Sequence, residues 1–172
     1  MNGIKQTAPV VIRWLIRKDM RRILQIENAS FDCPWTEDEF LSVLRERNCI
    51  GMVAEHEKQT AGMMIYELER TRLHILNFAV APEFRRLDVG TQMIEKLHNK
   101  LSQQRRTELI LEVRESNLGA QLFFKAQGFR AVKILPGYYE ETGEDAYQMV
   151  WRMPAESVNE GRGPAVNRIS QY

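Results

Sequence analysis

A short turn near the middle of the chain combines two arginines with the start of an amphipathic helix, an arrangement that suits an anionic ligand. Residues 76–82 are predicted to end a strand, the turn Arg85-Arg86-Leu87-Asp88 follows, and helical periodicity begins at Val89. The first N–H groups of a helix have no partner within it and lie at the positive end of the helix dipole. Phosphate groups bind at such ends. Asp88 opposes this interpretation, because its carboxylate would repel a phosphate.

Glu112 is the second residue whose setting points to chemistry, because it is the only charged residue in the apolar run 109–113. A carboxylate is costly to bury unless it has a partner. Three roles therefore remain open for Glu112: a proton acceptor in catalysis, a structural ion pair with Arg114, or a solvated position at a sheet edge.

Apolar periodicity predicts the elements that must position these residues. Strands are expected at 10–14, 49–55, 61–68, 72–80, 109–113, 132–134 and 146–151, and helices at 19–31, 36–44, 89–101 and 118–127. Thr36 and Glu39 fit a capping box, and Gly128 is typical of a helix C-terminus. A polar loop containing Gly137, Tyr138 and Tyr139 is expected between the last two strands. The pattern predicts an α/β fold, with one sheet and helices on both faces.

Composition limits the classes of protein to which the chain can belong. Its 172 residues suit one domain, its net charge of +1 argues against a dedicated nucleic-acid binder, and no apolar run is long enough to span a membrane. Cys33 and Cys49 form no CxxC pair. The three histidines lack the spacing of a metal site, so we expect these histidines to be ordinary strand and helix residues. We expect a cytoplasmic protein, with a disordered tail at residues 154–172.

The order of these motifs resembles the GNAT superfamily of acetyl-CoA-dependent N-acetyltransferases, and within it the RimI-type ribosomal-protein N-terminal alanine acetyltransferases. The resemblance covers residues 10–153. Apart from the arginine turn, four stretches carry it: Pro34-Trp35-Thr36; Leu111-Glu112-Val113-Arg114 with Ser116-Asn117; Gly128-Phe129; and Tyr138-Tyr139 followed by Glu144-Asp145-Ala146 and Met149. It implies a GNAT domain over residues 1–153, with a mixed, mostly antiparallel sheet that is splayed at its centre.

The resemblance also implies roles for single residues, with acetyl-CoA as cosubstrate and no metal. Glu112 matches the general base that takes the proton of the attacking amine through water. Trp35, Tyr138 and Tyr139 match positions that bind the acceptor. The cofactor-binding positions are Phe78, Ala79, Val80, Arg85, Arg86, Leu87, Asp88, Val89, Gly90, Thr91 and Asn117.

Two positions depart from the family pattern. Asp88 stands where the family has a glycine, and it would either cap the helix, face solvent or weaken cofactor binding. Phe124 stands where the family has a tyrosine that protonates the departing thiolate. We expect Phe124 to fill the core. Without a tyrosine at this position, Tyr138, Tyr139 or water would supply the proton, or turnover would be slower.

Alternative interpretations also remain for three of the acceptor-side features. Trp35 and the tyrosine pair could belong to the packed core and loop instead of the binding site. Glu144 and Asp145 could hold an α-ammonium group or form an ordinary acidic loop.

Acetyl transfer to a protein N-terminal α-amine, most simply an alanine of a small-subunit ribosomal protein, is the leading functional hypothesis. The alternatives are acetyl transfer to lysine or a small amine, and a catalytically weak module that binds CoA or a partner protein. We expect no direct nucleic-acid contact, no membrane contact, and a monomer or weak oligomer.

Overall fold

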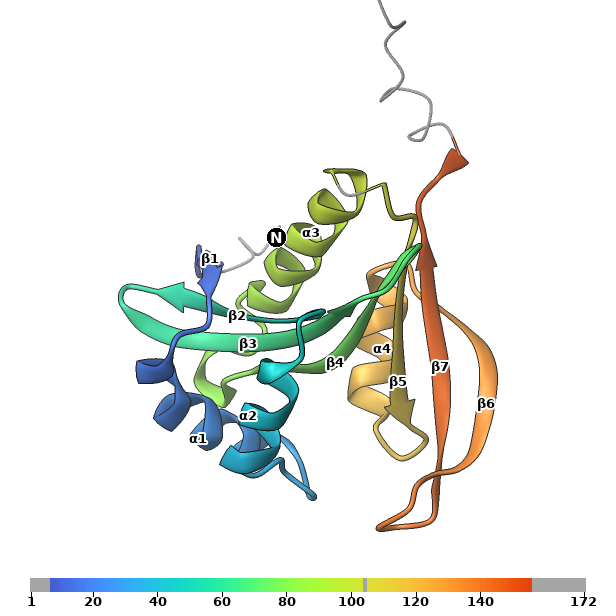
Figure 1. The fold of residues 1–172 in the computed structure, drawn as a ribbon, viewed down its shortest axis with the longest axis horizontal. Coiled ribbons are helices and arrows are strands. Elements are labelled where there is room, and N and C mark those ends of the chain that lie inside the picture. The colour runs from blue at the N-terminus through green and yellow to red at the C-terminus, as the bar shows by residue number, and fades with distance from the viewer. Residues whose placement is uncertain (1–6, 104, 156–172) are drawn as a thin grey trace, which may run out of the picture.

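One seven-stranded sheet runs through the protein in the order β1-β2-β3-β4-β5-β7-β6 (Figure 1). The structure, a computed structural model, describes residues 7–155 apart from residue 104. The strands are β1 (Val11–Trp14), β2 (Cys49–His56), β3 (Gln59–Leu68), β4 (Arg72–Val80), β5 (Glu108–Arg114), β6 (Arg130–Tyr139) and β7 (Glu144–Arg152). The helices are α1 (Met20–Ser30), α2 (Glu37–Arg45), α3 (Val89–Gln103) and α4 (Leu118–Ala126), with 3-10 turns η1 (Arg17–Asp19) and η2 (Pro82–Phe84).

The sheet opens at its centre, between β4 and β5. This pair is parallel, whereas the other five pairs of neighbouring strands are antiparallel. Its register is short: it begins with Arg72 beside Glu108 and ends with His74 beside Ile110. The rest of β4 continues to Val80 without pairing to β5. The predicted splay is therefore confirmed, and it leaves space between the two strands where side chains from both can line a site.

Helices cover both faces of the sheet, as predicted (Figure 1). The helix after the arginine turn buries the stripe Val89, Met93, Leu97 and Leu101, each at most 1% exposed. Burying an apolar side chain of this size stabilises the fold by about 1.5–3 kcal/mol. This stripe therefore fixes where the N-terminus of α3 points.

The predicted helix ends are confirmed by their hydrogen bonds and dihedral angles. The Thr36 Oγ1 atom accepts from the Glu39 N–H at 3.3 Å, and a Glu39 carboxylate oxygen accepts from the Thr36 N–H at 2.7 Å. Asn117 caps α4 by accepting from the Ala120 N–H at 3.0 Å. Gly128 has a φ of +89°, which explains a glycine at the end of that helix.

The expected loop around Tyr138 and Tyr139 is wrong, because β6 continues to Tyr139. This edge strand is exposed along almost its whole length, so it lacks the alternating apolar pattern by which a strand is recognised. Its register against β7 shifts between Leu135 and Tyr139, and Gly137 there has a φ of +59°.

The predicted tail, residues 154–172, lies outside the described residues except for its first two positions. Within residues 7–155 without 104, no helix is long and apolar enough to cross a membrane.

Candidate active site

A cavity of about 630 Å³, here called cavity one, lies at the arginine turn. It is bounded by the end of β4, the turn, the first residues of α3 and the inner side of α4. Every position predicted from the resemblance to bind cofactor lines it, with one exception. Leu87 does not, because it packs against the core and its carbonyl accepts from the Ala8 N–H at 2.9 Å. The other lining residues are Ser30, Phe31, Phe84, Gly119, Ala120, Phe123, Phe124 and Gln127.

The arginine turn owes its shape to two residues with left-handed backbone conformations. Arg86 has a φ of +62° and Asp88 a φ of +66°. A non-glycine residue in this region stores about 1–3 kcal/mol of strain. The extended backbone usual for an N-cap residue is therefore not the one that Asp88 adopts. A glycine would adopt the same φ without this strain.

The two arginines of the turn differ in their surroundings. Arg85 extends back over the turn, where its guanidinium donates to the Val80 carbonyl and to the Ser30 hydroxyl, both at 3.1 Å. Arg86 is exposed at the rim of cavity one. Arg85 therefore braces the turn, and Arg86 adds positive charge at the cavity mouth.

Gly90 has a packing role in addition to its place in the cavity wall. A Cβ atom at this position would lie 2.9 Å from the Phe123 ring of α4, closer than side chains can approach. Without a side chain here, α3 and α4 come together at the wall of cavity one.

A second cavity of about 250 Å³, here called cavity two, occupies the splay between β4 and β5. Glu112, Trp35 and Tyr139 line it, whereas Tyr138 does not and is 46% exposed. Cavities one and two have five lining residues in common, which are Phe31, Phe78, Asn117, Ala120 and Phe124. A ligand in one cavity could therefore meet a ligand in the other at this shared wall.

Glu112 is held in cavity two by two side-chain donors from neighbouring strands. One carboxylate oxygen lies 2.6 Å from His74 Nε2 and the other accepts from Gln148 Nε2 at 3.1 Å. Burial by itself would raise the pKa of Glu112. The hydrogen bonds from His74 and Gln148, with the positive charges of His74 and Arg72, outweigh burial and hold that pKa below its ordinary value.

The suggested ion pair between Glu112 and Arg114 is wrong. Arg114 instead pairs with Glu141 and with Glu144, the latter at 2.9 Å, and its guanidinium lies 3.8 Å from the centre of the Tyr139 ring. Glu144 is therefore engaged by Arg114, which favours a structural role for the acidic loop. Its neighbour Asp145 accepts from the Gly137 N–H at 2.8 Å.

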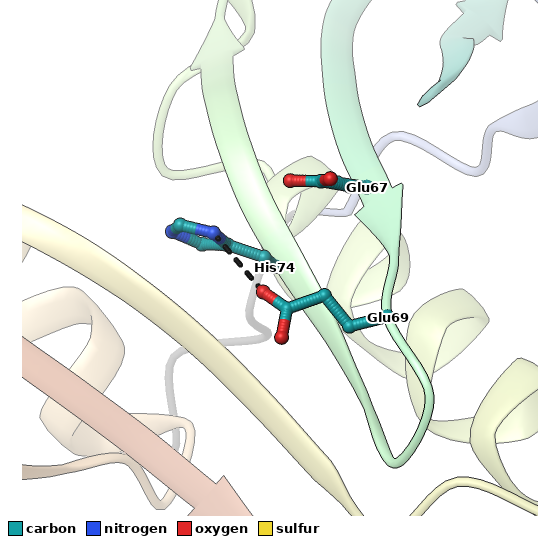
Figure 2. A group of neighbouring side chains, drawn as sticks. All are labelled: Glu67, Glu69 and His74. Carbon is teal, nitrogen blue, oxygen red and sulfur yellow. Dashed lines mark ion pairs between the residues drawn. The ribbon is translucent and has the colours of Figure 1, made fainter. Parts of the chain in front are cut away.

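His74 was expected to be an ordinary strand residue, and this expectation is wrong. Its Nε2 atom meets Glu112, and its Nδ1 atom lies 3.6 Å from a carboxylate oxygen of Glu69 (Figure 2). The hydrogen bond to Glu112 raises the pKa of His74 above its ordinary value, although burial opposes this. A carboxylate on each side therefore favours the imidazolium form.

Figure 2 also shows Glu67 beside His74 and Glu69, a set that could suggest a metal site. Their contacts argue for another role. Glu67 accepts from Asn48 Nδ2 at 2.6 Å, and Glu69 is paired with Arg72 at 2.5 Å. A guanidinium in contact with Glu69 supplies the positive charge that a metal ion would otherwise bring.

Phe124 fills the core, as expected, and is also part of the cavity walls. It is 6% exposed and packs edge-on against the rings of Phe78, Phe123 and Phe129. It also lines both cavities. Among the described residues that line cavity two, Tyr139 alone carries a hydroxyl group, which donates to the Glu112 carbonyl at 3.4 Å. Burial raises the pKa of Tyr139 to about 12.

The site thus has the parts for transfer of a group to a nitrogen atom: a cationic cavity with a helix N-terminus, and beside it a cavity with an ionised carboxylate. The profile described as "Acetyltransferase (GNAT) family" matches residues 19–129 of this chain. The chain belongs to the GNAT family of acetyltransferases. The matched segment spans the arginine turn, Glu112 and Phe124, so both departures lie within the family domain.

Individual members of the GNAT family support this assignment. An N-acetyltransferase of Methanocaldococcus jannaschii is 32% identical over 84% of this chain and 93% of that protein. The Escherichia coli enzyme named ribosomal protein bS18-alanine N-acetyltransferase is 30% identical over 76% of this chain and 89% of its own length. Its crystal structure aligns over 84% of this chain and 94% of that chain with a TM-score of 0.75. Ard1 from Thermoplasma volcanium aligns with a TM-score of 0.77 and 29% identity, over 84% and 98% of the two chains.

Proposed function

We propose that this GNAT acetyltransferase moves an acetyl group from acetyl-CoA to the N-terminal α-amine of a protein, an alanine of a small-subunit ribosomal protein being the leading candidate. The observation that carries the proposal is the common wall of the two cavities, with Glu112 in cavity two. Relatives whose names include ribosomal protein bS18-alanine and N-alpha acetyltransferases support the same acceptor class. We also propose that the reaction takes place in the cytoplasm.

Cavity one fits the cofactor by its chemistry. The N–H groups at the start of α3 and the guanidinium of Arg86 would hold the pyrophosphate, and the β4 segment 78–80 with Asn117 would hold the pantetheine arm. When bound, acetyl-CoA supplies the acetyl group as a thioester.

Glu112 has the role of proton acceptor in this proposal. An α-amine has a pKa of about 8, so much of it is protonated at neutral pH and must lose a proton before it can attack. Glu112 takes that proton, directly or through one water. Its lowered pKa keeps it ionised and ready to accept.

The departing thiolate has no tyrosine at position 124 to protonate it. A thiol with an ordinary pKa of about 8.5 forms a stable enough anion to leave without an acid. Tyr139 keeps its phenolic proton at neutral pH and lies in cavity two, so of the two tyrosines it is the better candidate donor.

A peptide panel tests the acceptor class. We expect purified protein with acetyl-CoA to acetylate peptides with a free N-terminal alanine, and mass spectrometry of each peptide reports the product. Peptides with a blocked N-terminus and an internal lysine are the matched controls. Acetylation confined to the lysine peptides would reject the N-terminal acceptor, and no acetylation of any peptide would favour the binding module.

Asp88→Gly is expected to tighten acetyl-CoA binding by at least about fivefold, because it removes a carboxylate near the phosphates. At 5 Å and an effective dielectric of 20, such a carboxylate would oppose a phosphate charge by about 3 kcal/mol, which sets the upper limit. Isothermal titration calorimetry measures the dissociation constant.

Lys58→Gly is the control for Asp88→Gly. Lys58 has the same φ of +66° but lies in the β2–β3 turn and does not line cavity one. The Lys58→Gly substitution should relieve similar backbone strain and leave the dissociation constant for acetyl-CoA unchanged. Equal affinity of wild type and Asp88→Gly would show that the Asp88 side chain points away from the bound phosphates.

A further inference from the structure

Two polar side chains in the wall of cavity two take no part in the chemistry described so far. Glu27 projects from α1 and is 1% exposed, and Asn77 projects from β4 and is 7% exposed. Asn77 Nδ2 donates to one oxygen of Glu27 at 3.0 Å. The other oxygen accepts from the Trp35 N–H at 2.9 Å. The pair therefore joins α1, β4 and the segment before α2 at the cavity wall.

The amide oxygen of Asn77 lacks a hydrogen-bond partner within the described part of the chain. Leaving a buried acceptor unsatisfied costs about 1–3 kcal/mol. Rotating the amide would not relieve it, because an ionised Glu27 only accepts hydrogen bonds and requires Asn77 Nδ2 to face it. Asn77 Oδ1 is therefore fixed as an acceptor for an N–H donor from elsewhere.

The Glu27 carboxylate has no cationic partner among the described residues. Both of its partners are neutral N–H groups, and among residues 7–155 without 104 no lysine, arginine or histidine forms an ion pair with it. Burial raises the pKa of Glu27 accordingly. A buried carboxylate is normally paired with a cation, so the wall of cavity two presents an incomplete ion pair.

We propose that Asn77 and Glu27 form the subsite that binds the acceptor's α-ammonium group, with Asn77 Oδ1 accepting one N–H and the Glu27 carboxylate supplying the counter-charge. Glu27 then selects and holds the charged amine, and Glu112 removes its proton. Because Asn77 Oδ1 exposes less than 1 Å², binding of a donor there requires a displacement of the cavity wall. This inference rests on the proposed function, because it names the group by which that acceptor is recognised.

Glu27→Gln tests the subsite with little change to the fold. The Gln oxygen can still accept from the Trp35 N–H, and its NH₂ group can donate to Asn77 Oδ1 once the Asn77 amide rotates. The variant thus gives Asn77 Oδ1 an internal partner and removes the charge, while Asn77 Nδ2 takes the unpaired position. We expect KM for an alanine-leading peptide to rise by about tenfold or more, as for loss of a charged hydrogen bond. The melting temperature and the dissociation constant for acetyl-CoA should not change.

A des-amino peptide, in which hydrogen replaces the α-amino group, separates recognition from structural support. Calorimetry on the CoA-loaded protein should show that wild type binds the amine-bearing peptide more tightly than the des-amino peptide, and that Glu27→Gln binds both alike. Glu37→Gln, an exposed change on α2 outside cavity two, is the control and should retain the wild-type preference.

The possible outcomes distinguish this inference from the proposed function. If wild type acetylates peptide N-termini and Glu27→Gln keeps its KM and its preference for the amine, the subsite is wrong and the proposed function stands. If Glu27→Gln lowers the melting temperature but keeps the preference for the amine-bearing peptide, Glu27 has only a structural role and the proposed subsite is wrong. If wild type acetylates no peptide N-terminus, the proposed function fails and this inference fails with it.

Discussion

Glu112→Gln is expected to lower kcat for an alanine-leading peptide by about 10²–10⁴-fold, the usual contribution of a positioned general base. Glutamine has nearly the same shape, so it can fill the place between His74 and Gln148, but its amide cannot accept the proton of the amine. Cavity one does not include Glu112, so the dissociation constant for acetyl-CoA should stay within about twofold, as for an independent site. Thiol release gives the rate, and calorimetry gives the affinity.

Glu108→Gln provides the matched control for Glu112→Gln. Glu108 lies on the same strand, pairs with Arg152 and lines neither cavity. Its rate should remain close to that of wild type. If Glu112→Gln and wild type turned over equally fast, the proton would have to leave by another route, and Glu112 would lose its assigned role.

His74→Gln is expected to move the acidic limb of the kcat/KM profile upward by about one to three pH units. Glutamine can still donate a hydrogen bond to Glu112, but it lacks the positive charge. That charge lowers the pKa of Glu112, so its removal raises this pKa and protonates the base at higher pH. The rate deficit should therefore be largest at low pH. It should shrink as the pH rises through the raised pKa of His74, where wild type loses the same charge.

Three carboxylates surround His74, and one of them provides a second test of this pH effect. Glu112 faces it from β5, Glu69 from the β3–β4 turn and Glu67 from β3. Glu69→Gln should lower the pKa of His74 but leave the acidic limb in place, because His74 stays protonated in the pH range where Glu112 titrates. His56→Gln is the control, since His56 contacts the Pro9 carbonyl and lines neither cavity. Superimposable profiles for wild type and His74→Gln would show that His74 does not tune Glu112.

Local signals in the sequence were enough to predict the strand, the arginine turn and the helix N-terminus that form one side of cavity one. Strand, turn and helix follow one another there, so the positions of Arg86, Gly90 and Thr91 depend on neighbours along the chain. The left-handed φ of Asp88 explains why the family has glycine at this position. The capping box at Thr36 and Glu39 was predictable for the same reason, because its two residues lie in one helical turn.

The partners in cavity two could not be predicted, because they come together only in the folded sheet. His74 and Glu112 are 38 residues apart and meet through the short parallel pairing of β4 and β5. Glu27 and Asn77 are 50 residues apart. The apolar context of Glu112 showed that it needed a partner, and Arg114 was suggested because it lies two residues away. The hairpin of β6 and β7 instead supplies the partners of Arg114.

The two departures from the family pattern have different consequences in the folded protein. Asp88 affects cavity one through backbone conformation and charge, so its effect should appear in cofactor affinity. Phe124 lies in the wall common to both cavities, where an apolar ring replaces a proton donor, so its effect should appear in the rate. The Glu112 carboxylate keeps its hydrogen bonds with His74 and Gln148 in spite of both departures.

Fragment-ion mass spectrometry of a single peptide tests the central claim most directly. The peptide carries a free N-terminal alanine and an internal lysine, and it is incubated with acetyl-CoA and either wild type or Glu112→Gln. The predicted result is one acetyl group on the α-nitrogen with wild type and far less product with the variant at the same time point. Acetylation of the lysine nitrogen in preference to the α-nitrogen, or equal product from both proteins, would contradict it.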